Sequence, residues 1–254
     1  MGFVVPIARF TLLEAFRNKM LVLALALALA SLGVAAFIHQ VALIEAAQIQ
    51  AAIIAAVSRV CAVFLLATFV VSSVAREYND KVVELVLSHP LPRWAYVLGK
   101  FGGFAASGIV LAVVFALPLL LFAPLARVSI WGVSLALELI LITATSLFCV
   151  LTLTNVMTAL AAVAGFYVLA RSIGAVQVIA SASTASALPS DVVLRKFTEL
   201  LALLLPNLDR ITQSAWLTDP AVGSAVLGTV AIQAGSALLL VLSAAMFDFY
   251  RQNF

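Results

Sequence analysis

The chain alternates long apolar segments with short polar ones. Six segments are apolar over about 17 to 27 residues, a length that crosses a hydrocarbon core about 30 Å thick at 1.5 Å per helical residue. The pattern therefore predicts an all-α polytopic membrane protein with a single transmembrane domain over residues 1–254. The predicted spans are 20–38, 59–75, 101–122, 131–152, 157–174 and 221–247.

The residues before the first span predict an amphipathic helix that lies on the membrane surface. Apolar residues recur there at helical spacing, with charged residues among them: Phe3, Ile7, Phe10, Leu13 and Phe16, then Arg9, Glu14, Arg17 and Lys19. Such a helix is too polar to span, but its aromatic side chains suit the boundary between head groups and acyl chains.

The densest set of charges lies in residues 76–100, between the second and third spans. The flanking segments 60–75 and 101–123 contain no charged residue. A charged insert between two apolar spans lies in water, so this segment forms a loop outside the bilayer.

The beginning of this loop predicts a continuation of the helix. Glu77 is four residues before Lys81, and Arg76 is four residues before Asp80, so both pairs are oriented for i,i+4 attraction. Prolines at 90 and 92 then end the helix and bend the chain. A second short helix starts at Pro92, where the missing N–H has no cost.

The order of residues in this loop carries a family resemblance. Arg-Glu at 76–77 is followed by Lys-x-x-Glu-Leu-x-Leu-Ser-x-Pro-Leu-x-Arg over 81–93 and by Leu-Gly-Lys at 98–100. The pattern resembles the cytoplasmic loop after the second span of ABC-2 type exporter permeases, the transmembrane subunits of type V-like exporters. In that family the loop forms a coupling helix that docks into a separate ATPase subunit.

The resemblance implies further properties of this chain. It implies an elbow helix before span one. It implies that ATP and Mg bind to the partner ATPase, with no cofactor in this chain. It also implies that the chain pairs, through spans one and five, with a second copy of itself or with a related permease. Small residues in span five, Ala159, Ala161, Ala162, Ala164 and Gly165, suit such packing. The implied ATPase-coupling residues are Arg76, Glu77, Asp80, Lys81, Glu84, Leu85, Leu87, Pro90 and Arg93.

Composition agrees with the membrane class. Hydrophobic residues make up 65% of the chain and charged residues 10%, with a mean hydropathy of +1.22, against roughly 25% charged residues in soluble domains. The net charge of +3 is small and dispersed, so we expect no nucleic-acid partner. Cys61 and Cys149 fall inside apolar spans and read as packing residues, not as a disulfide or a metal site.

The chain lacks the motifs of other membrane functions. It has no G-x-x-x-x-G-K-[ST], since Gly99-Lys100 lacks both the upstream glycine and the following hydroxyl residue, so ATP hydrolysis requires another subunit. His39 and His89 lie outside the spans, and no H-E-x-x-H occurs. The chain itself is thus expected not to be an enzyme. An integral membrane enzyme, or a channel or transporter not driven by ATP, remains the alternative function.

Three ionisable residues fall in or beside the apolar spans: Arg59, Glu138 and Arg171. Counting along the helices places all three in the outer third of the bilayer. Because charges at membrane depth usually pair or face a cavity, we expect Glu138 to pair with Arg171, across the hairpin of spans four and five, or with Arg59.

The connections on the outer side complete the prediction. Residues 39–58 predict an outer helical extension, 124–130 a short turn, and Trp131 an interfacial aromatic residue at the start of span four. Pro118 predicts a kink in span three, and 153–156 a tight turn centred on Asn155. Within 181–219, residues 194–205 predict an interfacial or re-entrant outer helix ended by Pro206.

Orientation follows from the basic residues near the spans. With the amino terminus inside, eight lie on the cytoplasmic side and five on the outer side, which predicts a multi-pass protein of the cell inner membrane with both termini cytoplasmic. The cytoplasmic set is Arg9, Arg17, Lys19, Arg76, Lys81, Arg93, Lys100 and Arg251. The outer set is Arg59, Arg127, Arg195, Lys196 and Arg210.

Overall fold

The computed structural model describes residues 4–41, 46–81, 92–153, 155–182, 208 and 225–251, and these residues form helices without any strand. Five of the helices contain an apolar stretch long enough to cross a membrane, and α7 contains a shorter one over Val156–Ser172. The helices are α1 Val4–Arg17, α2 Met20–Val41, α3 Ala46–Asn79, α5 Arg93–Ala116, α6 Leu125–Leu153, α7 Val156–Ala182 and α10 Ala225–Arg251, with a 3-10 turn η1 at Pro118–Leu121. The chain is a multi-pass membrane protein.

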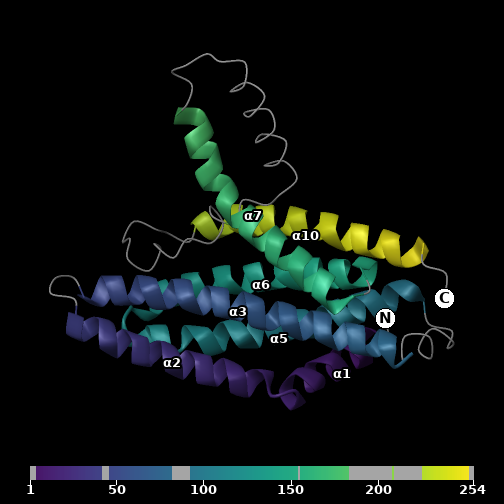
Figure 1. Ribbon diagram of the computed structural model, residues 1–254, viewed down its shortest axis with the longest axis horizontal. Helices are drawn as coiled ribbons and strands as arrows, with labels where there is room; N and C mark the ends of the chain where they lie inside the picture. Colours follow the sequence, from purple (N-terminus) through teal and green to yellow (C-terminus); the bar gives the residue numbers. More distant parts are fainter. Residues whose placement is uncertain are drawn as a thin grey trace.

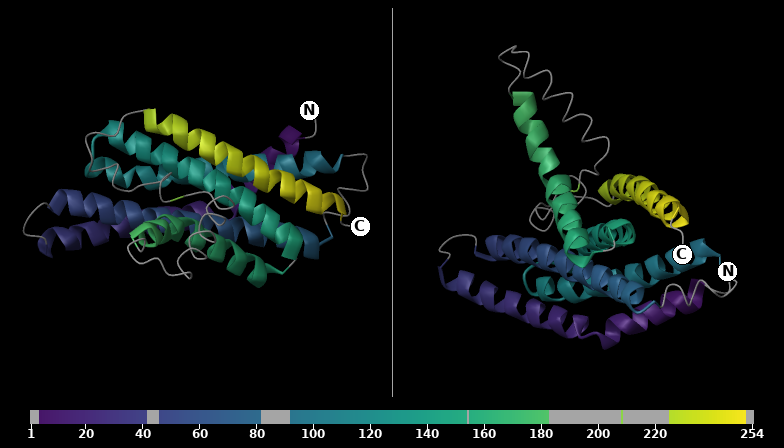
Figure 2. Two further views of the ribbon diagram at one scale, coloured as in Figure 1. Left: turned by 90° about the horizontal axis from the view of Figure 1, so that it is seen from above. Right: turned by 45° about the vertical axis from the view of Figure 1, so that its right-hand side comes forward.

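The long helices α2, α3, α5, α6 and α10 run side by side (Figure 1). Helix α6 lies at the centre of the bundle, because it packs against α3, α5, α7 and α10. Helix α7 leans away from the others along its length, as Figure 1 and the right-hand view of Figure 2 show. Its packing partners among the described helices are α6 and α3.

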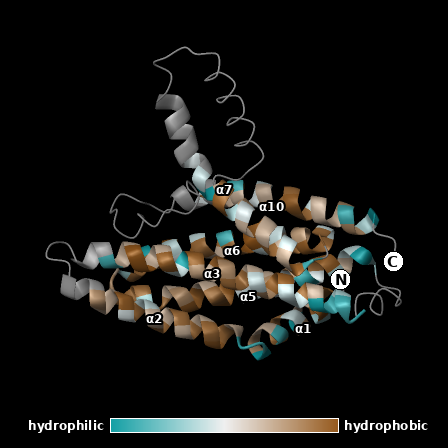
Figure 3. Ribbon diagram, viewed as in Figure 1, coloured by the Kyte–Doolittle hydropathy of each residue, from teal (hydrophilic) through white to brown (hydrophobic). Residues whose placement is uncertain are grey.

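Both termini lie at one end of the bundle, called here the terminal end (Figure 1). Helix α1, the end of α3, the start of α5 and the last turn of α10 meet there. Figure 3 shows hydrophilic residues gathered at this end, while the middle of the bundle is mostly hydrophobic. The hydrophilic residues of the described helices therefore gather at this end, apart from the apolar middle of the bundle.

Helix α1 packs on the first half of α5 through two glycines, as short side chains allow close approach. A Cβ at Gly103 would lie 2.5 Å from Thr11 Cβ and 2.7 Å from the Ala8 carbonyl oxygen. A Cβ at Gly99 would lie 2.8 Å from Ile7 Cβ. The helix predicted before span one is thus present, and it is joined to α5 by a close crossing.

Several predicted boundaries were wrong, mostly because the helices continue beyond the apolar spans. Helix α6 begins at Leu125, where a turn over 124–130 was expected. Pro118 opens the 3-10 turn η1 in place of a kink within span three. Helix α10 runs to Arg251, four residues beyond the end predicted for span six at 247. The outer helical extension before span two was predicted correctly, since α3 begins at Ala46 and continues through that span.

Two connections bear on the site described below. The second helix predicted at Pro92 is not short: Pro92 precedes Arg93, and α5 continues without a break through Ala116. The tight turn after α6 is present, since α7 starts at Val156 and its first turn is capped by Asn155 Oδ1, which accepts a hydrogen bond from Met157 N at 3.0 Å. The predicted helix at 194–205 lies outside the described residues.

Candidate functional site

A buried ion pair joins α3 to α6 inside the bundle. Arg59 Nη1 donates to Glu138 Oε2 at 2.5 Å, and Arg59 Nη2 donates to Ser134 Oγ at 3.1 Å. Both charged side chains are 0% exposed. A charge at this depth is tolerated only with close partners, so the pair fixes the relative position of the two helices.

The third ionisable group comes from α7. Arg171 Nη1 lies 3.3 Å from Glu138 Oε1, and its side chain is 28% exposed. The sequence left open whether Glu138 pairs with Arg171 or with Arg59. In the structure the carboxylate uses one oxygen for each guanidinium, and a single residue of α6 contacts both α3 and α7.

Trp131 completes this cluster as a buried residue. Its side chain is 0% exposed, and the Arg59 guanidinium carbon lies 5.2 Å from the centre of the ring, within the range of a cation–π contact. The sequence predicted Trp131 at the start of span four; in the structure α6 begins six residues earlier, so Trp131 lies inside the helix. Trp131 and Ser134 precede Glu138 by seven and four residues, which places all three on one helix face; this spacing could have identified them from the sequence.

Two buried polar atoms of this cluster, Arg59 Nε and Trp131 Nε1, have no hydrogen-bond partner among the described residues. Tyr167 packs edge-on against Phe64, with ring centres 6.1 Å apart. The cluster offers charge pairing and hydrogen-bond donors. Among the described residues, no group of three His, Cys, Asp or Glu side chains could hold a metal ion.

A second polar network occupies the terminal end. Glu14 of α1 accepts hydrogen bonds at Oε1 from Ser73 Oγ at 2.7 Å and from Arg76 Nη2 at 2.9 Å. This ion pair is partly exposed, with Arg76 at 55% and Glu14 at 28%. It connects α1 to the end of α3.

Glu77 pairs with α5 instead of with its own helix. Lys100 Nζ forms an ion pair with Glu77 Oε1, and the Tyr96 hydroxyl donates to Glu77 Oε2 at 2.8 Å. The predicted i,i+4 helix through Lys81 was wrong: α3 ends at Asn79, and Lys81 has a φ of 55°, outside the helical region. Lys100, expected at the end of a solvated loop, is 6% exposed inside α5.

Arg93 lies at the start of α5 and faces the end of α10. Its Nη1 donates to the carbonyl oxygens of Phe249 and Tyr250, both at 3.4 Å. Of the remaining predicted coupling residues, Asp80 and Lys81 form the exposed turn after α3. Four others, Glu84, Leu85, Leu87 and Pro90, lie outside the described residues.

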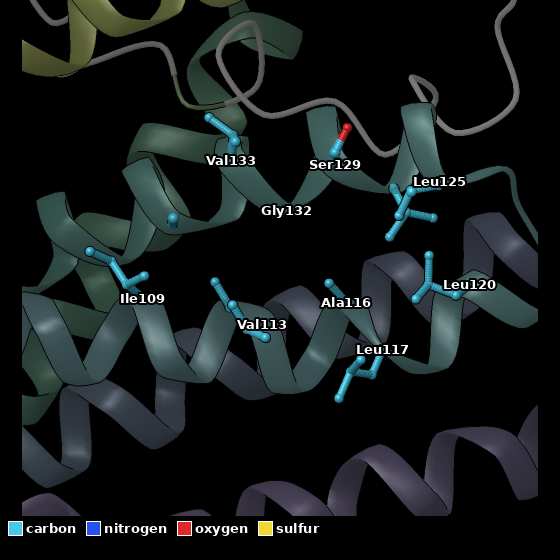
Figure 4. Close-up of a pocket in the computed structure, with 12 residues that line it drawn as sticks. Ile109, Val113, Ala116, Leu117, Leu120, Leu125, Ser129, Gly132 and Val133 are labelled. Carbon is cyan, nitrogen blue, oxygen red and sulfur yellow. The ribbon is translucent and has the colours of Figure 1, made fainter.

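The bundle also has apolar grooves. Figure 4 shows one between α5 with η1 and α6. Ile109, Val113 and Leu117 line it from one side and Leu125 and Val133 from the other, and its volume is about 370 Å³. Ser129 is its only lining residue with a polar side chain. This groove can accommodate apolar groups such as lipid chains and offers no reactive chemistry.

The small residues expected at a dimer contact divide between two faces of α7. Ala159 is buried against the bundle, whereas Ala161 and Gly165 are exposed, and a Cβ at Gly165 would meet no atom within 4 Å. Ala162 and Ala164 are half-buried. The exposed positions are the ones available to a second chain.

Comparison with known proteins does not assign the chain to a family. No protein-family model matches it, and no curated protein matches it. The function proposed below therefore rests on the residues and contacts of this chain.

Proposed function

We propose that this chain is the membrane-spanning permease subunit of an ATP-driven ABC-2 type exporter. Two copies, or this chain and a related permease, form the translocation pathway, and a separate subunit binds ATP and Mg. The segment between α3 and α5 is the element that docks into that ATPase. The proposal includes no nucleic-acid partner and assigns no cofactor to this chain.

The observation that carries the proposal is how the two helix ends on either side of residues 82–91 are held in place. Both helix ends that bound this segment are held by polar contacts in a predominantly apolar chain: α3 by Glu14 through Arg76, and α5 by Glu77 through Lys100 and Tyr96. A loop that only connects two spans needs no such contacts. An element that transmits force from a hydrolysing subunit needs rigid attachment to the membrane helices.

These contacts revise the roles of three predicted coupling residues. Arg76, Glu77 and Arg93 contact other helices of this chain, so they attach the docking segment. The residues that touch the ATPase are then Asp80, Lys81, Glu84, Leu85, Leu87 and Pro90. In this arrangement the terminal end is cytoplasmic and the protein resides in the cell inner membrane, which agrees with the excess of basic residues at that end.

The test is purification of the tagged full-length chain from its own cells in a mild detergent. We expect a subunit with a G-x-x-x-x-G-K-[ST] motif to co-purify, and ATP hydrolysis to accompany it in reconstituted vesicles. Glu84→Lys should release that subunit, because losing one partner of an interfacial charge pair costs about 2–5 kcal/mol. Arg127→Gln, at the opposite end of the bundle, is the matched control.

Three results would contradict the proposal. One is a chain that purifies without any nucleotide-binding subunit and yet supports transport or conductance in vesicles, which would favour a channel or a transporter not driven by ATP. Another is an unchanged complex and unchanged ATP hydrolysis in Glu84→Lys. The third is catalytic turnover by the purified chain alone, which would instead favour a membrane enzyme.

A further inference from the structure

The last turn of α10 packs directly on the first turn of α5. The Phe249 ring stacks on the Tyr96 ring, with centres 5.7 Å apart and planes 17° apart. Phe249 is 0% exposed and Tyr96 is 3% exposed. Phe247, two residues earlier on the same helix, is 66% exposed. Only one of the two phenylalanines therefore belongs to the contact.

Polar groups reinforce the same contact. The last carbonyls of a helix have no partner within the helix, and here the Phe249 and Tyr250 carbonyls accept hydrogen bonds from Arg93. A cation at a helix C-terminus is also favoured by the helix dipole. Asp248 Oδ2 accepts from the Thr152 hydroxyl at 2.8 Å, so the turn is also attached to the end of α6.

Tyr96 extends the contact to α3. Its ring faces Phe249, while its hydroxyl donates to Glu77, which also pairs with Lys100. Phe249, Tyr96 and Glu77 therefore form a continuous connection from α10 through α5 to α3. The two helix ends that bound residues 82–91 are both part of it.

We propose that the last turn of α10 is a positioning element for these two helix ends, with Phe249 and Tyr96 as the positioning residues. The inference rests on the proposed function in one respect, since the positioned ends are those that carry the docking segment. Its consequence is that side chains at the carboxyl end of the sequence control coupling, although they are more than 150 residues from Arg93 along the chain.

The experiment measures the distance between the two helix ends in the full-length chain. Nitroxide labels are attached at Asp80→Cys and Pro92→Cys, two exposed positions, after Cys61→Ala and Cys149→Ala. Pulsed electron paramagnetic resonance then gives the distance distribution. Phe249→Ala removes the stacking contact, and Phe247→Ala is the matched control on the same helix. Arg93→Gln is a second variant, which removes the bonds to the α10 carbonyls and keeps both rings of the stack.

We expect Phe249→Ala and Arg93→Gln to broaden the distribution, and Phe247→Ala to leave it as in the parent. In vesicles with the ATPase bound, Phe249→Ala should lower transport per ATP by roughly 2- to 30-fold, the range for couplings carried by remote side chains. A distribution as narrow as the parent's in both variants would overturn the inference. Broadening in a chain that binds no ATPase would retain the positioning role and reject the proposed function.

Discussion

Arg59 on α3 and Glu138 on α6 form a salt bridge of 2.5 Å in which both side chains are fully buried. Such a pair adds little net stability over an apolar contact, because desolvation offsets the attraction. Removal of one partner is costly, because it leaves a buried charge without compensation. Arg171 contacts the same carboxylate at 3.3 Å from a partly exposed position. The two arginines should therefore respond differently to substitution.

The first prediction concerns this cluster. Glu138→Gln and Arg59→Gln should each lower the free energy of unfolding by about 3–5 kcal/mol, and the double variant by less than their sum. Arg171→Gln should cost less than Arg59→Gln, because its side chain is 28% exposed. Thermal unfolding in detergent and protein yield measure these effects. Strictly additive losses, or equal losses for the two arginines, would contradict the arrangement.

The second prediction compares the two ion pairs at the terminal end. The Lys100–Glu77 pair is 7% and 19% exposed, whereas the Arg76–Glu14 pair is 55% and 28% exposed. Lys100→Met should therefore destabilise clearly, while Arg76→Gln should cost about 1 kcal/mol or less, as exposed pairs do. High salt should weaken only the second pair. A larger loss for Arg76→Gln than for Lys100→Met would exclude this ranking.

The third prediction concerns the crossing of α1 and α5. Gly103→Ala places a methyl group 2.5 Å from Thr11 Cβ and 2.7 Å from the Ala8 carbonyl oxygen. The helices must move apart, at a cost of about 1–3 kcal/mol for an overpacked contact. Proteolysis of α1 in vesicles should become faster. Gly235→Ala is the control, since no atom lies within 4 Å of its added Cβ; equal effects from both variants would argue against the close crossing.

The fourth prediction addresses assembly. Gly165 is exposed on α7 with open space around it, so Gly165→Trp should leave the single chain folded and disrupt a dimer that uses this face. Mass measurement in a mild detergent distinguishes dimer from monomer. Val133→Trp, on the exposed side of the α5–α6 groove, is the control. A dimer that persists in Gly165→Trp places the contact elsewhere.

The sequence predicted the helical membrane class and the proximity of the three membrane-depth charges, because both follow from one-dimensional properties. Apolar length identifies spans, and the cost of an unpaired charge requires a partner. Glu77 was assigned to the wrong partner for a specific reason. The i,i+4 rule considers one helix, whereas Lys100 becomes available to Glu77 only because α5 extends back to Arg93 and lies beside α3.

Trp131 illustrates the same limit. A tryptophan at the start of an apolar segment is typical of the membrane interface, but the helix begins six residues earlier and the ring packs under Arg59. The contact between Phe249 and Tyr96 could not be predicted at all. It joins residues far apart in the sequence. An aromatic residue near the end of an apolar helix does not indicate which residue it will contact.

The Arg59–Glu138 pair also constrains how the chain enters the membrane during synthesis. Arg59 precedes Glu138 by 79 residues, and a growing chain is delivered from its amino terminus. Helix α3 is therefore complete before its counter-ion has been made. An arginine at the centre of an inserting helix costs about 2.5–3.5 kcal/mol on insertion scales, and one in the outer third costs less. The apolar residues on both sides of Arg59 must offset that smaller cost until α6 follows.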